Sequence, residues 1–227
     1  MIILTGASGG IGSKILTKLA GLDKVIALYH SNIPEIKKNR NIIFQQIDLL
    51  SEKNLIDFSS FTSKKYNKFT LIHAATVSND SLVASTSSES WKETLDINLN
   101  AVFILNREFA KHMMNEKWGR IIHFSSIVSS KGVPGTVAYA TSKAGLIGIS
   151  RVIAREYARF NITSNIISLG YFDTGLIDTL SNSMKKSIMN EIPSKKLGNP
   201  DEIVNAIEFF MKSSYANGSI LSLDGAI

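Results

Sequence analysis

Ser126, Tyr139 and Lys143 are the residues of this chain whose types and spacing could carry chemistry. Tyr139 and Lys143 are four positions apart, so on a helix their side chains lie on one face, one turn above each other. The Lys143 ammonium could then lower the pKa of the phenol from its usual value near ~10 toward neutral pH. A serine hydroxyl brought alongside would hold a carbonyl oxygen where the phenol can protonate it. The alternative is a solvated surface pair, so the interpretation depends on the elements around these residues.

A glycine-rich turn near the N-terminus provides the second part of a mechanism. The chain runs from the apolar residues 2–4 through Thr5-Gly6-Ala7-Ser8-Gly9-Gly10-Ile11-Gly12 into a helical pattern. Gly6 permits a tight turn, Gly10 lets the backbone approach a pyrophosphate, and Gly12 allows the helix to pack closely on the sheet. The N-terminus of that helix would offer free N–H groups and the positive end of its dipole to the phosphates. A plain glycine-rich connector is the alternative, but a position on the first strand–helix turn favours a dinucleotide site.

The residues after the second predicted strand bear on which dinucleotide is bound. No acidic residue follows that strand, where one would bind the ribose hydroxyls and repel a 2′-phosphate. His30 and Ser31 could instead donate to a 2′-phosphate, with the lysines at 37–38 nearby, so NADP is favoured over NAD. After the third strand, Asp48 and the neighbouring Leu49 could contact the adenine. Capping of the following helix is the other role open to Asp48.

Short apolar, β-branched runs alternate with amphipathic stretches along the whole chain. Strands are predicted at 2–5, 24–29, 42–47, 69–75, 119–125, 162–169 and 219–223. Helices are predicted at 10–20, 52–64, 89–115, 138–160 and 201–212, and turns at 30–34, 76–90, 129–136 and 170–200. This alternation predicts an α/β protein: a single-domain Rossmann-type doubly wound parallel sheet of about seven strands with helices on both faces. No linker or repeat marks a second domain, so residues 1–227 are expected to form one domain, with a substrate lid around 170–196.

Composition excludes several classes of site. The chain has 227 residues, 44% of them hydrophobic, which is enough for a substantial core. It has no cysteine, which excludes disulfides and thiolate sites, and its 4 histidines lack metal-ligand spacing, so no metal is expected. The net charge of +6 is spread along the chain, which argues against nucleic acid, and no apolar run approaches the ~20 residues of a membrane span. The chain enters its first strand without a leader, so cytoplasmic localisation is expected, and His73 and His123 are interpreted as structural.

Together with three further segments, the glycine turn resembles the short-chain dehydrogenase/reductase family, most closely its 3-oxoacyl-(acyl carrier protein) reductases. The segments are Asp96-Ile97-Asn98-Leu99-Asn100, Gly119-Arg120-Ile121-Ile122-His123-Phe124-Ser125-Ser126, and the run 192–203 after the lid, so the resemblance covers essentially the whole chain. It implies that Ser126 orients a substrate carbonyl and that Tyr139 is the general acid. Lys143 would bond the nicotinamide ribose, and Asn98 would hold a water that links Lys143 to solvent. The cofactor-binding residues would be Gly6, Ser8, Gly10, Ile11, Gly12, His30, Ser31, Asp48, Leu49, Ala74, Ala75, Tyr139, Lys143, Gly170 and Thr174.

Some positions depart from the family pattern. The family's Asn-Asn-Ala-Gly after the fourth strand reads His73-Ala74-Ala75-Thr76 here, so Thr76 adds a Cβ where glycine is usual. The Pro-Gly near the nicotinamide reads Leu169-Gly170, although Thr174 still matches the residue that bonds the carboxamide. Gly9 stands where many NADP enzymes carry a basic residue, which leaves NAD as the alternative cofactor.

The resemblance implies an NAD(P)H-dependent carbonyl reductase that converts a 3-oxoacyl thioester to its 3-hydroxyacyl form. The same chemistry on a sugar, polyol or other secondary alcohol is the alternative, and a dinucleotide-binding protein without catalysis is a third. Apolar residues of the lid would line the substrate site: Tyr171, Phe172, Leu176, Ile177, Leu180, Met184 and Met189. Several lysines would meet an acyl carrier protein or be merely solvated: Lys117, Lys185, Lys186, Lys195 and Lys196. The helices 89–115 and 138–160 are apolar on more than one face, which favours packing against another subunit. Because these helices pair in dimers and tetramers in the resembled family, the resemblance implies a homo-oligomer, a dimer or a tetramer.

Overall fold

The computed structural model describes residues 1–175, 177 and 181–227, and its centre is a seven-stranded sheet. The strands are β1 (Ile2–Thr5), β2 (Val25–Tyr29), β3 (Ile42–Gln46), β4 (Thr70–His73), β5 (Gly119–Ser126), β6 (Ile162–Leu169) and β7 (Ile220–Leu223). They lie in the order β3-β2-β1-β4-β5-β6-β7, and each neighbouring pair is parallel. The predicted parallel sheet is confirmed, and the largest difference in strand bounds is at β4, which ends at His73 instead of residue 75.

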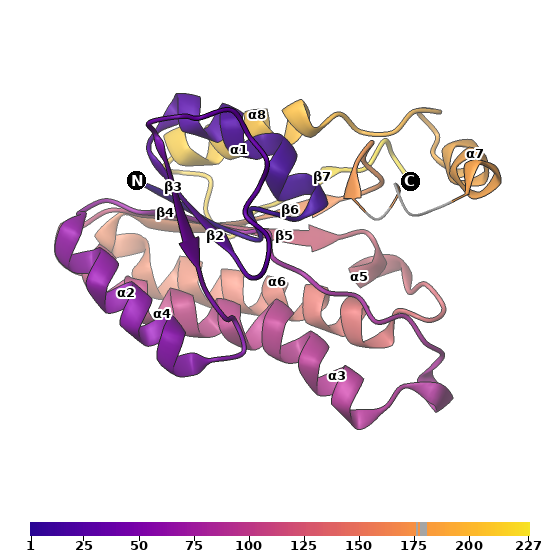
Figure 1. The fold of residues 1–227 in the computed structure, drawn as a ribbon, viewed down its shortest axis with the longest axis horizontal. Helices are drawn as coiled ribbons and strands as arrows, with labels where there is room; N and C mark the ends of the chain where they lie inside the picture. Colours follow the sequence, from indigo (N-terminus) through magenta and orange to yellow (C-terminus); the bar gives the residue numbers. More distant parts are fainter. Residues whose placement is uncertain (176, 178–180) are drawn as a thin grey trace.

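The strand order reverses between β1 and β4. From β1 the chain builds outward to β3, returns to β4 on the other side of β1, and then builds outward to β7. In doubly wound sheets, ligands bind outside the carboxyl ends of the strands where the order reverses. In Figure 1 the carboxyl end of β5 points toward the side on which α5 (Val128–Lys131) and α7 (Asn182–Glu191) lie. Functional side chains are therefore expected along this edge of the sheet.

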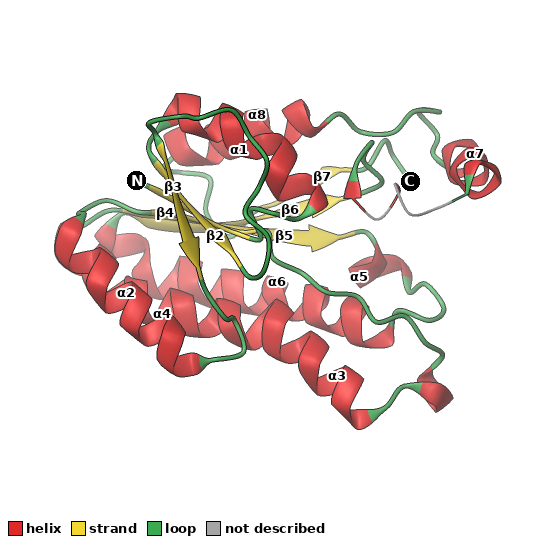
Figure 2. Cartoon of the chain, viewed as in Figure 1, coloured by secondary structure: helices red, strands yellow, loops and turns green. Residues whose placement is uncertain are grey.

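Helices cover both faces of the sheet (Figures 1 and 2). One face carries α1 (Gly10–Leu22) and α8 (Pro200–Lys212); the other carries α2 (Glu52–Lys65), α4 (Ala101–Glu116) and α6 (Val137–Tyr157). Because successive side chains of a strand point to opposite faces, Leu4 packs into the core that includes α1 and Ile3 into the core that includes α4. Burial on both faces explains why the central strands are apolar without alternation. None of the helices in the described ranges has the length and apolar character needed to cross a membrane.

The predicted helix 89–115 is wrong in one respect, because a π-helical turn interrupts it. α3 (Ser88–Leu95) is followed by the turn η2 (Asp96–Asn100), and only then does α4 begin. In a π-helical turn the backbone bonds span one residue more than in an α-helix, and such turns are frequent at functional sites. Here the turn directs Asn98 inward, and its side chain is only 1% exposed.

Several segments predicted as turns contain short helices. The region 129–136 was expected to be a turn, which is wrong, because α5 occupies its first part. The region 76–90 contains the 3-10 turn η1 (Val83–Ser85), and a second such turn, η3 (Ala158–Phe160), ends α6. The lid region contains α7, which begins after Ser181 because the Ser181 hydroxyl accepts a bond from the N–H of Met184.

The connection from β2 to β3 lacks the helix that usually joins parallel neighbours. Residues 30–41 contain no helix, although a crossover between parallel strands generally includes one. Asn41 Nδ2 donates to the carbonyl oxygen of Ala20 at 2.9 Å, which ties the loop to α1. A groove of about 640 Å³ lies beside this loop, lined by Ile36, Lys37, Lys38, Asn39, Arg40, Ile42 and Phe44.

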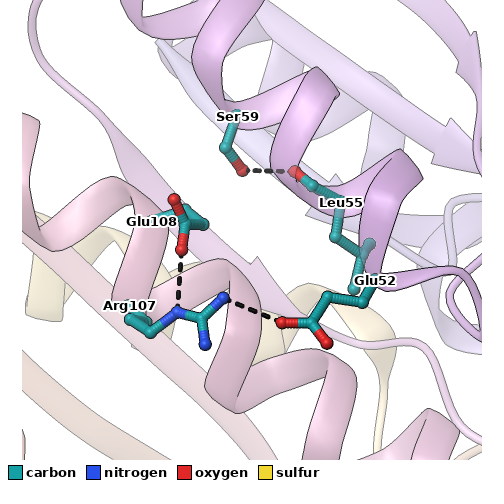
Figure 3. A network of polar contacts seen from close by, with 5 residues as sticks. All are labelled: Glu52, Leu55, Ser59, Arg107 and Glu108. Atoms are coloured by element: carbon teal, nitrogen blue, oxygen red, sulfur yellow. Dashed lines mark hydrogen bonds and ion pairs between the residues drawn. The ribbon is translucent and has the colours of Figure 1, made fainter.

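Polar contacts, which Figure 3 shows, and an aromatic pair join α2 and α4 side by side. Arg107 of α4 donates from Nη2 to Glu52 of α2 at 3.0 Å and from Nε to Glu108 at 2.7 Å. Exposed ion pairs of this kind contribute little to stability. The edge-to-face pair of Phe58 and Phe109, with ring centroids 6.1 Å apart, therefore contributes more to the contact. Together these contacts position α4, whose first turn follows Asn98.

Candidate active site

The four residues expected to be catalytic come from three elements that meet at the carboxyl end of β5. Ser126 is the last residue of β5, Tyr139 and Lys143 lie one turn apart on α6, and Asn98 lies in η2. Lys143 Nζ donates to the carbonyl oxygen of Phe124 in β5 at 2.9 Å, which draws α6 onto the strand. The Ser126 hydroxyl faces the Tyr139 phenol and lowers its pKa. The arrangement brings a hydroxyl, a phenol and an ammonium together.

Lys143 is buried on the inner side of α6. Its side chain is 3% exposed, and Nζ lies 5.6 Å from the centre of the Tyr139 ring. Burial disfavours the charged ammonium and lowers the pKa of Lys143 from 10.5 to about 8. At neutral pH the side chain still carries its proton, so a positive charge stands beside the phenol.

The pKa of Tyr139 differs from the expected direction. The ammonium of Lys143 was expected to lower it, but in this chain burial raises the pKa of the phenol above its usual value of 10. Hydrogen bonds from the hydroxyls of Ser126 and Thr76 oppose the rise, and the negative charge of Asp80 adds to it. The predicted lowering is therefore wrong for the chain by itself, because desolvation outweighs the favourable neighbours.

The two adjacent serines at the end of β5 have different surroundings. Ser125 is buried, and its hydroxyl donates to the carbonyl oxygen of Lys143 at 3.0 Å. Ser126 remains partly exposed, and its hydroxyl accepts a long bond of 3.4 Å from the N–H of Val128. Ser125 thus anchors α6 to the sheet, whereas Ser126 is the serine that faces Tyr139 and is accessible to a substrate.

Asn98 has more protein partners than the sequence suggested. Its Oδ1 accepts from the N–H of Val77 at 2.8 Å, and its Nδ2 donates to the carbonyl oxygen of Val77 at 2.8 Å and to Ser142 Oγ at 3.1 Å. Ser142 Oγ in turn donates to the carbonyl oxygen of Tyr139 at 2.7 Å. Both hydrogens of the amide are therefore used by the protein. A water bound at Asn98, as the resemblance implies, would need the backbone or the remaining lone pair of Oδ1.

The glycine turn has the geometry that a pyrophosphate requires. Gly6 has φ +69°, and a Cβ there would lie 2.6 Å from the backbone of Ala75, so only glycine fits. A Cβ on Gly12 would lie 2.1 Å from the carbonyl oxygen of Gly6. α1 begins after Gly9 with no side-chain cap and no acidic residue in its first turn. A helix N-terminus left open in this way suits a phosphate, so the residues present fit a dinucleotide.

The remaining residues expected at the turn lie around it. Ser8 is exposed at its tip, and Ile11 is in the first turn of α1, packed against the core. Ala74 and Ala75 both donate from their N–H groups to Thr5 Oγ1 at 3.1 Å, which holds the segment after β4 next to the turn.

The segment after β6 packs directly on the glycine turn. Thr174 is 5% exposed, and its Oγ1 donates to the carbonyl oxygen of Gly10 at 3.0 Å. A Cβ on Gly10 would lie 2.1 Å from Cα of Gly175, so the missing side chain of Gly10 makes room for this segment. Gly170 donates to the carbonyl oxygen of Leu223 at 2.9 Å, at the end of β7. The predicted cofactor residues Gly170 and Thr174 therefore lie on the side of the turn opposite to β2.

The residues expected to contact the adenosine half lie at the ends of β2 and β3. Ser31 Oγ and His30 Nδ1 form a hydrogen bond of 2.9 Å, and both residues are exposed. Asp48 Oδ1 accepts from the N–H of Leu50 at 2.9 Å, and Leu49 is partly buried. Asp48 does not cap α2, because that position belongs to Ser51. Lys37 and Lys38 line the groove beside the first residues of β3.

Some residues expected to line the substrate site have other surroundings. Phe172 belongs to the core and packs against Gly198, so it is not available as a lining residue. Ile177 is buried and Met184 is exposed, while Leu176 and Leu180 lie outside the described residues. Lys117 caps α4 before the start of β5, whereas Ser126 is at the far end of that strand, more than ~20 Å away. Lys117 therefore lies at the opposite end of β5 from the candidate site.

Two buried histidines stack behind the site. His73 and His123 are paired in register on β4 and β5, with ring centroids 5.1 Å apart and planes at 11°. Their Nε2 atoms bond Asn106 Oδ1 at 2.8 Å and Ser164 Oγ at 3.2 Å, respectively. Burial, supported by the charge of Lys143, lowers the pKa of His73 to about 4 and that of His123 well below its usual value. Both rings are neutral at neutral pH, in agreement with a structural role.

Three further residues belong to the site and were not predicted. Ser142 and Ser125 link Tyr139 and Lys143 to their surroundings, and the hydroxyl of Thr76 lowers the pKa of the phenol. For Thr76 a signal was available, since it replaces a glycine of the resembled pattern. For Ser125 and Ser142 the sequence carries no such signal, because only the folded structure shows which backbone groups their hydroxyls bond.

Comparison with known proteins supports the family that the sequence resembles. A family model described as "short chain dehydrogenase" matches residues 1–185 of the chain. The 3-oxoacyl-[acyl-carrier-protein] reductase FabG of Rickettsia felis is 34% identical over 229 residues, which cover 99% of this chain and 95% of the relative.

Solved structures share the fold at lower identity. A "putative gluconate dehydrogenase" of Agrobacterium tumefaciens is similar with a TM-score of 0.88 and 23% identity, covering 99% of this chain and 94% of that one. A "putative NAD(P) dependent gluconate 5-dehydrogenase" of Beutenbergia cavernae, with bound NADP, is similar with the same TM-score of 0.88, the same 23% identity and the same coverage, 99% and 94%. At this identity the likeness concerns the fold alone.

Proposed function

The chain belongs to the short-chain dehydrogenase family and is an NAD(P)-dependent oxidoreductase of alcohol and carbonyl groups; from this premise we propose that it reduces a 3-oxoacyl thioester to the 3-hydroxyacyl thioester. The observation that carries the substrate is the 34% identity, over 99% of the chain, to a 3-oxoacyl-[acyl-carrier-protein] reductase. The predicted family is confirmed by the family model. A dinucleotide-binding protein without catalysis, the third interpretation of the sequence, is therefore dropped.

The glycine turn and the start of α1 hold the pyrophosphate of the dinucleotide. The open N–H groups of that helix turn bond the phosphate oxygens, and the helix dipole favours their charge. Lys143 and Thr174 bind the nicotinamide half, as the resemblance implies. When bound, the reduced dinucleotide supplies the hydride, and the protein supplies orientation and electrostatics.

Ser126 and Tyr139 act on the substrate carbonyl. The Ser126 hydroxyl donates to the carbonyl oxygen and fixes it within reach of the phenol, and Tyr139 gives its proton to that oxygen as the carbonyl carbon is reduced. The buried ammonium of Lys143 compensates the negative charge left on the phenol. The reaction balances as ketone, reduced dinucleotide and one proton giving secondary alcohol and oxidised dinucleotide.

NADP is proposed as the cofactor in preference to NAD. No carboxylate stands at the end of β2 to repel a 2′-phosphate, and His30 and Ser31 offer donors at that position. The partly buried Lys185 and the exposed lysines at 186 and 195–196, on the lid side of the molecule, are proposed to meet an acidic acyl carrier protein. If NADH were used as well as NADPH, the proposed preference for NADP would be contradicted. Equal KM values for carrier-bound and free thioesters would contradict the proposed contact with an acyl carrier protein.

A homo-oligomer is proposed from the outer face of α4 and α6. Phe103 and Val152 are 51% and 54% exposed, and such apolar side chains on neighbouring helices favour contact with a second copy. Sedimentation at micromolar concentration is expected to show a dimer or tetramer. A monomer would contradict the proposal.

A panel of oxo substrates with NADPH and NADH in parallel tests the function. Acetoacetyl thioester should be reduced with NADPH, and Tyr139→Phe should lower kcat by about 10²- to 10⁴-fold while dinucleotide binding, measured by fluorescence, is retained. Tyr157→Phe, at the end of the same helix, is the matched control and should keep its activity. Turnover of gluconate or a polyol with no reduction of any thioester would replace the proposed substrate with the sugar alternative.

A further inference from the structure

The loop between β2 and β3 leaves one place on the sheet without a helix. Each of the other connections between consecutive strands contains one, namely α1, α2, α4, α6 and α8. Because β1, β2 and β3 follow one another in the same direction across the sheet, a right-handed crossover from β2 to β3 would lie on the face that carries α1. On that face α1 lies on β1 and β2, and α8 lies on β5, β6 and β7. The place beside α1 is taken by a loop instead (Figure 1).

The groove of about 640 Å³ beside this loop, called here the β3 groove, is lined in part by apolar side chains. Ile42 and Phe44 are two residues apart on β3, so their side chains share a face of the sheet, and both pack with the core that includes α1. Ile36 of the loop packs against the same core. Ile42 is buried, whereas Ile36 and Phe44 keep part of their surface exposed. The groove thus offers apolar surface on the face that lacks a crossover helix.

The border of the β3 groove is positively charged. Lys37, Lys38 and Arg40 line it and are exposed, and no acidic residue is among the described residues that line it. None of these three cations forms an ion pair with another described residue. Glu35, the acidic residue that precedes them in the loop, is exposed and does not line the groove. An occupant that matches this surface combines an apolar side with negative charges beside it.

An amphipathic helix with acidic residues has this combination of properties. Its apolar side chains recur at every third or fourth position and form a stripe, and charged residues flank the stripe. β3 is also an edge strand, so an extended segment could pair with its backbone. The β3 groove, however, is lined by side chains on the face of the sheet, and the rest of this face is covered by helices. A helix therefore fits the groove better than a strand.

We propose that the β3 groove binds an acidic amphipathic helix of a partner protein, in the place that a crossover helix would take. The apolar stripe of that helix lies against the three apolar lining residues, and its carboxylates pair with the three cations. The groove is at the first residues of β3, whereas the candidate catalytic residues meet at the carboxyl end of β5. A bound helix leaves the active site open, so the proposal does not depend on the function proposed above.

Acidic helical peptides test the β3 groove in the full-length protein. A panel of fluorescent, stapled peptides of about 15 residues carries Leu, Ile or Phe along one face and Glu on both flanks. Fluorescence anisotropy should show micromolar binding of at least one of them, and the amide NMR signals of residues 36–44 should shift most. A peptide of the same composition with its apolar residues scattered around the helix should bind at least about 10-fold more weakly. Tyr139→Phe should bind the peptide as the wild type does.

Variants of the two kinds of lining residue separate charge from apolar contact. Lys37→Glu/Lys38→Glu should weaken binding by about 10-fold or more, because like charges then face the Glu residues of the peptide. A peptide with Lys in place of Glu should bind this variant better than the wild type. Lys64→Glu/Lys65→Glu is the matched control, since it reverses an exposed lysine pair on α2, which covers the opposite face of the sheet. Ile36→Ser, with the charge unchanged, should weaken binding about 3- to 10-fold.

Four results would overturn the proposal. The first is no binding by any peptide of the panel, and the second is equal binding of the peptide with scattered apolar residues. The third is displacement of the peptide by vesicles of anionic phospholipid that bind the wild type, which would assign the groove to a membrane surface. The fourth is a lower oligomeric state of Lys37→Glu/Lys38→Glu in sedimentation, which would assign the groove to a second copy of the chain.

Discussion

Asn98 holds Val77 through both atoms of its amide group, with Oδ1 accepting from the Val77 N–H and Nδ2 donating to the Val77 carbonyl oxygen, each at 2.8 Å. β4 has already ended at His73, so Val77 has no neighbouring strand. The amide of Asn98 instead bonds the N–H and the carbonyl oxygen of Val77, as a strand partner would. The π-helical turn makes this possible, because it directs Asn98 out of the helix ladder and toward the sheet. The backbone of the loop that carries Thr76 is thereby held in place by hydrogen bonds, although the loop is not part of a strand.

Asn98→Ala should therefore destabilise the protein by about 2–4 kcal/mol, because two backbone groups of the partly buried Val77 lose their partner, a side chain that is 1% exposed. Urea denaturation measures the change. Asn100→Ala is the control in the same turn, since its exposed amide bonds only Asp96. The control should change the stability by less than about 0.5 kcal/mol. Equal effects of the two substitutions would show that the Val77 contact contributes no stability.

The burial of Lys143 predicts a dependence of stability on pH in the alkaline range. Between about 8 and 10.5, the folded and the usual pKa of this lysine, the unfolded chain binds a proton that the folded chain has lost. The contribution of Lys143 to stability should accordingly increase as the pH rises through this range, by up to about 3 kcal/mol. Methionine cannot be protonated, so Lys143→Met should be more stable than the wild type at about pH 7.5, and this difference in stability should disappear by about pH 10. Parallel stability curves for the two proteins would contradict the burial of the charge.

The burial of the two histidines predicts that the stability of the protein also depends on pH in the acidic range. His73 has a pKa of about 4 when folded, and that of His123 is also lowered, so below about 6.5 the unfolded chain binds protons that the folded chain rejects. Stability should fall with falling pH through this window, by up to about 1.4 kcal/mol per pH unit for each ring. His123→Leu should make the fall less steep than in the wild type. Denaturation curves at several pH values from 7 to about 5 measure both slopes.

Two glycines of α1 should respond in opposite directions to the same substitution. Gly12→Ala would place a Cβ 2.1 Å from the carbonyl oxygen of Gly6, and relief of that overlap should cost about 1–3 kcal/mol. Gly21→Ala meets nothing within 4 Å and should stabilise the helix by about 0.5–1 kcal/mol. Thermal unfolding of the two variants checks the signs. Dinucleotide binding should weaken only in Gly12→Ala, because only that residue belongs to the turn.

The elements of this fold could be predicted because they depend on local patterns. Strands buried on both faces appear as apolar runs, and the glycine turn has steric requirements that few other residues meet, as the φ of +69° at Gly6 illustrates. The π-helical turn at Asn98 could not be predicted, because one extra residue leaves the apolar pattern before and after it almost unchanged. The helix within 129–136 was missed for another reason, since α5 has only 4 residues.

The residues of the candidate site were predictable as types but not as partners. The spacing of Tyr139 and Lys143 identifies a pair on one helix face, yet the direction of the phenol pKa depends on desolvation by segments far away in the chain. Phe172 was assigned to a substrate wall because it is apolar and lies in an irregular segment. In the folded chain it packs into the core. Apolar character alone does not distinguish a wall from a core.

The burial of β5 determines how rarely this strand opens. It pairs with β4 and β6 on its two sides, and its first seven residues are buried. The amide protons of such a strand exchange with water only when the whole protein unfolds, which takes minutes to days in stable domains. Hydrogen exchange should therefore find β5 among the slowest segments. Since enzymes of ordinary speed turn over many times per second, the attachment point of Ser126 should stay in place for thousands of catalytic cycles between one opening and the next.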